Sequence, residues 1–295
     1  MDWFNYAVIT TIIWAISAIL LKISLRRLTA ITYMVLTTPA AFCVLIVLLM
    51  GPFTLPPPKV VLFIGASALA AFLGYWCWLK AISKEDISKI MILNNFEPLL
   101  VLFLASLFLK ETLTLYNYLA FPLIITGGVL ISVEKVKEKI VVSPAIIWLF
   151  LAILLYAIQA LIFKYVSYTD FISMMIIRQM TYFMLVVLVW LLSSRVRMQV
   201  MGELRRYRWR SICWPYAAEV LGIAGLILYY VSVQGGPVSL VALINATQSL
   251  AIIGSVVLIS RYAPQILKEK VDRKSITLKI ISALLMIGGL YLTAL

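Results

Sequence analysis

The chain has 295 residues, of which 64% are hydrophobic, with a mean hydropathy of +1.06 and a formal net charge of +13. A soluble domain needs more polar residues to cover its surface, so this composition excludes a soluble protein. The sequence contains no histidine, which excludes imidazole chemistry and removes the commonest metal ligand. Its three cysteines have neither the spacing of a metal site nor that of a disulfide framework.

Apolar runs of about 20 residues, the length that crosses the hydrocarbon core of a bilayer as a helix, recur along the chain. The sequence lacks the alternation of apolar and polar residues that a membrane β-barrel requires. We therefore predict an all-α membrane protein with ten transmembrane helices. In chain order, the predicted spans are 4–21, 29–50, 60–80, 89–109, 115–133, 144–164, 170–193, 211–233, 237–260 and 275–294.

Five predicted helices precede the loop at 134–143, and five follow it. Because five is an odd number, the two halves enter the membrane in opposite directions. We predict two inverted five-helix repeats, residues 1–139 and 140–295, that form one integrated membrane domain. Inverted repeats of this kind are typical of secondary transporters.

Short sequence patterns support the repeat, because four of them recur in the same order. The distance between copies grows from 142 to 161 residues, since the loops of the second half are longer. The pairs are Trp14–Lys22 with Tyr156–Lys164, Asn94–Glu97 with Asn245–Gln248, Lys110-Glu111 with Lys268-Glu269, and Gly127-Gly128 with Gly288-Gly289.

Basic residues are distributed unevenly between the two sides of this topology. One set of alternate loops and helix ends holds 21 lysines and arginines, and the other set holds 3. We expect the protein in the plasma membrane, and the positive-inside rule then predicts that both termini lie outside the cell. The cytoplasmic loops would be 22–29, 81–88, 134–143, 194–210 and 261–274.

The longest of these loops, 194–210, mixes apolar residues with six arginines. We expect an interfacial helix there, in contact with anionic lipid headgroups. The basic loops 22–29 and 261–274 are expected to contact the same headgroups. A docking site for a cytoplasmic partner is the alternative for 194–210. Nucleic acid is not expected as a partner, because the basic residues follow the membrane topology.

The segment 93–130 combines a proline in the predicted fourth helix (Pro98), a glutamate at the end of that helix (Glu111) and paired glycines in the fifth. This combination resembles the drug/metabolite transporter superfamily, in particular its ten-helix EamA-like branch. The counterpart at 245–290 keeps the glutamate and the glycines but has Ser249 in place of Pro98. The resemblance implies a ten-helix solute transporter. Members of that branch usually keep both termini in the cytoplasm, whereas the loop charges here place them outside.

Ionisable residues inside a span indicate function, because each costs about 2.5–3.5 kcal/mol at mid-membrane on the insertion scale. Glu97, Arg178 and Glu219 are such residues. Arg178 and Glu219 could pair across the seventh and eighth helices, or they could both face a cavity. Burial in lipid disfavours the charged form of a carboxyl group, so Glu97 and Glu219 are candidates for proton coupling.

Polar and aromatic side chains occupy matching positions of the two repeats and could line opposite walls of one cavity. The alternative is that the polar groups only fasten helices to each other by hydrogen bonds. Aromatic rings at this depth can stack on an apolar or cationic solute. The predicted binding residues are Trp14, Ser17, Trp78, Asn94, Glu97, Tyr156, Gln159, Arg178, Glu219, Tyr229, Asn245 and Gln248.

Other repeated residues have simpler explanations. Lys22 and Lys164 lie near helix ends and could extend to lipid headgroups. The paired glycines are expected to allow close helix approach, and the fifth and tenth helices to pack at the periphery. Glu111 and Glu269 are expected to be structural.

These observations predict a secondary active transporter that moves a small amphipathic solute, such as an amino acid, by alternating access, driven by protons or the solute gradient. The alternative is a flippase or an accessory subunit that handles lipid-linked intermediates. We expect no enzyme, cofactor or metal, because the sequence has no nucleotide-binding motif, metal-ligand cluster or nucleophile–base pair. The expected assembly is a monomer or a homodimer.

Overall fold

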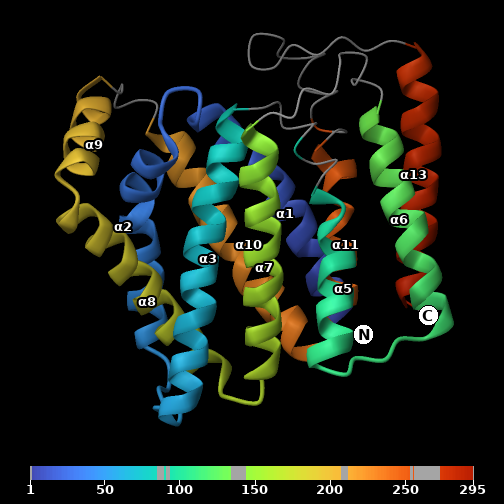
Figure 1. Ribbon diagram of the computed structural model, residues 1–295, viewed down its shortest axis with the longest axis horizontal. Coiled ribbons are helices and arrows are strands. Elements are labelled where there is room, and N and C mark those ends of the chain that lie inside the picture. The colour runs from blue at the N-terminus through green and yellow to red at the C-terminus, as the bar shows by residue number, and fades with distance from the viewer. Residues whose placement is uncertain are drawn as a thin grey trace.

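The structure, a computed structural model, describes residues 2–84, 90, 94–133, 144–206, 212–252, 255 and 273–294. In this part of the chain all regular secondary structure is helical, and six helices are long and apolar enough to cross a membrane, which confirms the predicted all-α membrane fold. The helices are α1 (Asp2–Ser24), α2 (Ala30–Leu49), α3 (Pro58–Lys84), α5 (Glu97–Phe108), α6 (Leu115–Val133), α7 (Pro144–Tyr165), α8 (Phe171–Leu192), α9 (Ser194–Arg206), α10 (Cys213–Gly235), α11 (Val238–Ala246) and α13 (Arg273–Ala294) (Figure 1).

The first helices of the two halves, α1 and α7, run in opposite directions, and both chain termini lie at the same end of the bundle (Figure 1). We call this end the terminal end. The helix ends next to the basic loops lie at the other end. The predicted boundary between the repeats, in the 134–143 loop, lies outside the described residues, as does the basic loop 261–272.

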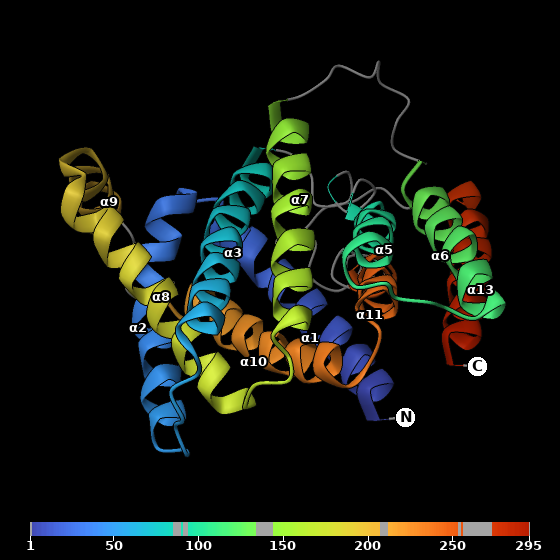
Figure 2. The same cartoon turned by 60° about the horizontal axis from the view of Figure 1, so that its bottom comes forward.

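The two halves interlock, because the first helix of each half packs against the third helix of the other: α1 against α10, and α7 against α3. Figure 2 shows α1 and α10 crossing below α3 and α7. In both pairs an aromatic ring lies over a glycine. A Cβ at Gly225 would come within 2.5 Å of the Trp14 ring, and one at Gly74 within 3.1 Å of Tyr156. The ring-on-glycine contact therefore occurs twice between the halves, with one ring from each half.

Helices α6 and α13 form a pair at one edge of the bundle (Figure 1), as predicted for the fifth and tenth helices. Gly127 lies against Met286 and the backbone carbonyl of Ser282, and Gly289 lies against Ile124. A Cβ at either glycine would come within 2.6 Å of a neighbouring side chain, so both allow the close approach that was predicted. Gly288 differs, because a Cβ there would contact nothing within 4 Å.

Lys22 and Lys164 both bind helix ends, which corrects the expectation that they extend to lipid headgroups. The Lys22 ammonium donates to the carbonyl of Ile82 in the last turn of α3, at 2.6 Å. The Lys164 ammonium donates to the carbonyls of Val233 and Gly236 at the end of α10, at 2.8 and 2.7 Å. A cation is favourable at a helix C-terminus, where carbonyl groups lack partners within the helix.

The fourth and ninth predicted spans are not continuous helices. Residues 95 and 96 form a turn before α5, and residue 247 forms a turn after α11, beyond which residues 248–252 are helical again. Pro98 explains the first break, because it has no N–H to donate to the preceding turn. At the second break the hydroxyls of Thr247 and Ser249 donate to the carbonyls of Ile244 and Ala246, at 2.6 and 3.0 Å. Such bonds compete with regular helix geometry.

The predicted interfacial segment forms α9, and its apolar side faces the protein. Val200 is 2% exposed and α9 packs on α2, whereas Met198 and Met201 are exposed. The Glu203 carboxylate accepts hydrogen bonds from the backbone N–H and the hydroxyl of Thr29, before α2, at 2.9 and 3.0 Å. Burial alone would raise the pKa of Glu203, but these hydrogen bonds outweigh it and hold the pKa below its usual value.

Glu111 has the structural role that was expected. Its carboxylate accepts hydrogen bonds from the hydroxyl and the backbone N–H of Ser239, at 2.5 and 3.3 Å. Ser239 lies in the first turn of α11, where N–H groups lack partners within the helix. A carboxylate is favourable there, so Glu111 holds the start of α11. Its counterpart, Glu269, lies outside the described residues.

Candidate functional site

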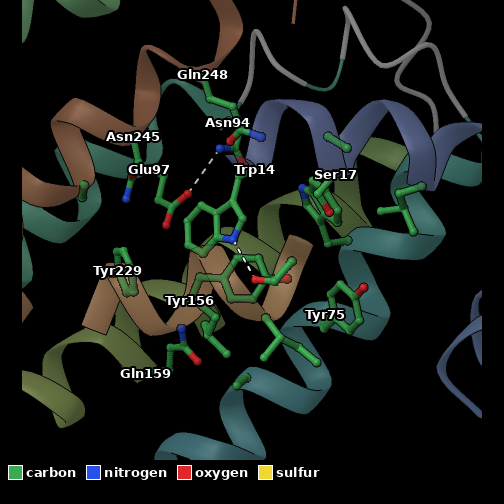
Figure 3. A pocket seen from close by; sticks show the side chains of 18 of the residues that line it. Trp14, Ser17, Tyr75, Asn94, Glu97, Tyr156, Gln159, Tyr229, Asn245 and Gln248 are labelled. Carbon is green, nitrogen blue, oxygen red and sulfur yellow. Dashed lines mark hydrogen bonds between the residues drawn. The ribbon is translucent and has the colours of Figure 1, made fainter. Parts of the chain in front are cut away.

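A cavity of about 200 Å³ lies among α1, α3, α5, α7, α8, α10 and α11. It is walled by both halves of the chain (Figure 3). All twelve residues that the sequence nominated line it: Trp14, Ser17, Trp78, Asn94, Glu97, Tyr156, Gln159, Arg178, Glu219, Tyr229, Asn245 and Gln248. The structure thus brings these residues together, and their contact with a solute stays a prediction.

Four polar residues of the cavity lie at the two helix breaks. Glu97 is the first residue of α5, and its carboxylate accepts a hydrogen bond from the Asn94 amide at 3.3 Å (Figure 3). At the other break, Asn245 accepts a hydrogen bond from the Thr11 hydroxyl at 3.1 Å. Gln248 is the first helical residue after that break. Each half therefore presents an amide before the break and a polar side chain directly after it.

One wall of the cavity is fixed by hydrogen bonds from α1 to the backbone of α10. The Trp14 indole donates to the carbonyl of Gly222 at 3.1 Å (Figure 3), and the Ser17 hydroxyl donates to that of Ala218 at 2.8 Å. The Trp14 ring lies 5.3 Å from the Tyr229 ring, centroid to centroid. This wall therefore has a fixed aromatic surface before any solute enters.

Arg178 and Glu219 do not pair, although the sequence left such a pair open. Arg178 donates from Nε to the Tyr230 hydroxyl at 2.8 Å. Glu219 accepts a hydrogen bond from the Tyr75 hydroxyl at 3.1 Å. Both ionisable side chains line the cavity, with 5% and 7% of their surface exposed. The cavity thus contains separate acidic and basic groups.

The sequence analysis missed several lining residues, among them Tyr75, Gln179 and Tyr182. Spacing could have indicated them, because Tyr75 precedes Trp78 by three residues and Tyr182 follows Arg178 by four. Gln179 is held by a hydrogen bond from its amide to the carbonyl of Ala41 on α2, at 3.2 Å. Helix α8 carries Gln179 and Tyr182 together with Arg178, the one residue of this helix that the sequence analysis nominated.

The described residues contain no group of three or more acidic or cysteine side chains that could hold a metal ion. The geometry defines a helical membrane protein in which α1 packs on α10 and α7 packs on α3, with a polar and aromatic cavity among these helices. Intramembrane cavities at the interface of repeats are typical of transporters.

Comparisons with known proteins agree with this class. Residues 3–133 match the EamA-like transporter family, which is part of the drug/metabolite transporter superfamily. The family match indicates a membrane transporter of small solutes.

Twenty-eight chains of solved structures match the fold. One of them, titled only "Crystal structure of protein", has a TM-score of 0.65 and 13% sequence identity, over 99% of this chain and 98% of the other. At this identity the likeness concerns the fold alone. No curated protein matches the sequence.

Proposed function

We propose that this protein is a secondary active transporter that moves a small amphipathic solute, such as an amino acid, by alternating access. The observation that carries the proposal is the cavity between the halves, lined by all twelve nominated residues. Interlocked inverted repeats can exchange their packing at the two ends of the bundle, which is how such transporters expose one site alternately to each side.

The side chains of the cavity suit a solute with both charged and apolar parts. Arg178 can bind an anionic group, and Glu97 and Glu219 can bind a cationic one. Trp14, Tyr229 and other rings offer apolar and cation–π surfaces. A highly anionic solute is less suited, because the lining contains two carboxyl groups and one arginine. Protons or the solute gradient would supply the energy, and Glu97 and Glu219 are the candidate proton carriers.

Blocking the cavity tests the proposal. Ala71 is buried on the cavity wall, so Ala71→Trp is expected to fill the cavity and lower amino-acid flux about tenfold or more. Purified protein in proteoliposomes, offered a panel of radiolabelled amino acids and related metabolites, provides the measurement. Leu69→Trp is the matched control, because Leu69 lies on the same helix and is 44% exposed. Equal flux through both variants would contradict the proposal.

We also propose that α9 lies on the cytoplasmic surface of the plasma membrane, against anionic headgroups. Arg195, Arg205 and Arg206 are exposed on α9 together with Met198 and Met201, while its apolar side faces α2. A basic, exposed face suits an anionic surface, at about 1 kcal/mol for each basic residue. This placement puts both termini outside the cell.

A single cysteine at Met201, in a chain with Cys43, Cys77 and Cys213 replaced by alanine, tests this placement. An impermeant maleimide is expected to label it only in permeabilised cells. A fluorophore on the same cysteine is expected to emit at shorter wavelength in nanodiscs of phosphatidylglycerol than in phosphatidylcholine. Labelling in intact cells would overturn the orientation, and equal emission in both lipids would overturn the headgroup contact.

A further inference from the structure

Arg178 is a buried cation that has no anionic partner among the residues that the structure describes. Its side chain is 5% exposed, and it forms no ion pair with any residue that the structure describes. Burying a charge is costly unless the charge is paired and hydrogen-bonded. Glu97 and Glu219 line the same cavity but bind Asn94 and Tyr75. An anion from outside the protein is therefore the missing partner of Arg178.

The guanidinium group retains donors for such an anion. Nε donates to the Tyr230 hydroxyl at 2.8 Å, whereas the terminal nitrogens donate no hydrogen bond to any described residue. These nitrogens carry four N–H groups, and guanidinium binds carboxylate through two parallel hydrogen bonds. Because Arg178 lines the cavity, a carboxylate that enters the cavity can reach it.

Tyr230 connects Arg178 to a packed layer at one end of the cavity. Tyr230, Gln159 and Phe163 form this layer, which we call the floor. The Tyr230 hydroxyl donates to the Gln159 side chain at 3.3 Å, and its ring lies 3.8 Å from that of Phe163, centroid to centroid. Tyr230 and Phe163 are 0% and 1% exposed.

This floor lies between the cavity and the terminal end of the bundle. Along α7, which runs towards that end, Gln159 is the last lining residue. Along α8, which runs away from it, Arg178 is the first. The side chains beyond, such as Val233 and Val166, are fully buried. The floor and these buried side chains together separate the cavity from the terminal end, and we call them the seal. Tyr230 therefore belongs to the seal.

We infer that Arg178 is the subsite for a carboxylate of the solute, and that Tyr230 holds the seal closed until this carboxylate engages Arg178. Guanidinium can bind a carboxylate through Nε together with a terminal nitrogen, and Nε is occupied by Tyr230. A carboxylate that takes Nε displaces the Tyr230 hydroxyl and loosens the floor. The inference rests on the proposed transport function and adds to it a solute class and a link between binding and opening.

Three related probes test the subsite: phenylalanine, 3-phenylpropanoate, which lacks the ammonium group, and phenethylamine, which lacks the carboxylate. Each is added to the purified protein, and the shift in melting temperature is measured. Both carboxylates are expected to stabilise the wild type. Arg178→Gln is expected to abolish the shifts in melting temperature caused by phenylalanine and 3-phenylpropanoate and to keep the shift caused by phenethylamine. Arg178→Lys, which keeps the charge, is expected to restore part of the two carboxylate shifts.

Carboxylate shifts that persist in Arg178→Gln would overturn the subsite, and so would the lack of any carboxylate shift in the wild type. Neither result decides whether the protein transports, because flux through the wild type and Ala71→Trp is measured independently.

A cysteine at Val233, in the cysteine-free chain, tests the seal. A water-soluble methanethiosulfonate is expected to label it slowly, and Tyr230→Phe is expected to speed labelling about tenfold, because the ring stays and the hydrogen bonds are lost. Tyr229→Phe is the control, because the Tyr229 hydroxyl donates to no described residue. 3-Phenylpropanoate is expected to speed labelling of the wild type but not of Arg178→Gln. Equal rates in Tyr230→Phe and Tyr229→Phe would overturn the role of Tyr230.

Discussion

Replacing Gly225 by alanine is expected to lower the free energy of unfolding by about 2–4 kcal/mol, the sum of an overpacking cost of about 1–3 and one lost hydrogen bond of about 1. The new Cβ would come within 2.5 Å of two atoms of the Trp14 ring. The ring cannot move aside freely, because its N–H donates to the carbonyl of Gly222 and its face lies against Tyr229. We therefore expect α1 to separate from α10 along this contact.

Titration of the purified protein with denaturing detergent, followed by tryptophan fluorescence, measures this effect. Gly222→Ala is the matched control, because a Cβ there meets only the Ser17 hydroxyl, at 3.5 Å. Alanine is the better helix former by up to about 1 kcal/mol, so this variant is expected to be at least as stable as the wild type. Gly74→Ala, with a contact of 3.1 Å to Tyr156, is expected to lie between the two.

Equal stability of the Gly225 and Gly222 variants would show that the Trp14 ring is not packed as the structure places it. A loss in both variants would point instead to general intolerance of α10 to larger residues. The expected order, with Gly225→Ala the least stable and Gly222→Ala the most, follows only from the ring-on-glycine contact.

The membrane spans could be predicted because their determinants are local. Each span needs about 20 apolar residues, and basic residues collect at the helix ends on one side. The breaks before α5 and after α11 were not predicted, because the same apolar runs continue through them. Pro98 marked the first break, but Thr247 and Ser249 act through hydroxyl bonds to nearby carbonyls, a signal that many unbroken helices also carry.

The cavity could be predicted in part because polar residues inside a membrane are rare. Repetition then indicated which of them lie at equivalent positions, as for Asn94 and Asn245. The partners of these residues could not be predicted, because they depend on how distant helices meet. The Tyr75–Glu219 and Tyr230–Arg178 hydrogen bonds join residues far apart in the sequence. Lys22 and Lys164 were misjudged for the same reason, since the helix ends they bind belong to other segments.

Replacing Glu97 by glutamine is expected to lower proton-driven accumulation of solute in proteoliposomes about tenfold or more, because an intramembrane carboxyl group that carries a proton cannot be replaced by an amide. The substitution should leave the local fold intact. Glutamine has nearly the same shape as glutamate, and its carbonyl oxygen can still accept the hydrogen bond from Asn94. The change therefore removes only the charge and the site for a proton.

The kind of flux that is lost separates the two roles of Glu97. If Glu97 carries a proton, Glu97→Gln stops accumulation against a gradient but preserves exchange of labelled for unlabelled solute. If Glu97 instead binds a cationic group of the solute, exchange falls as well. Glu203→Gln is the control, because Glu203 lies on α9 and does not line the cavity. Accumulation at the wild-type rate in Glu97→Gln would remove Glu97 from both roles and leave Glu219 as the remaining candidate.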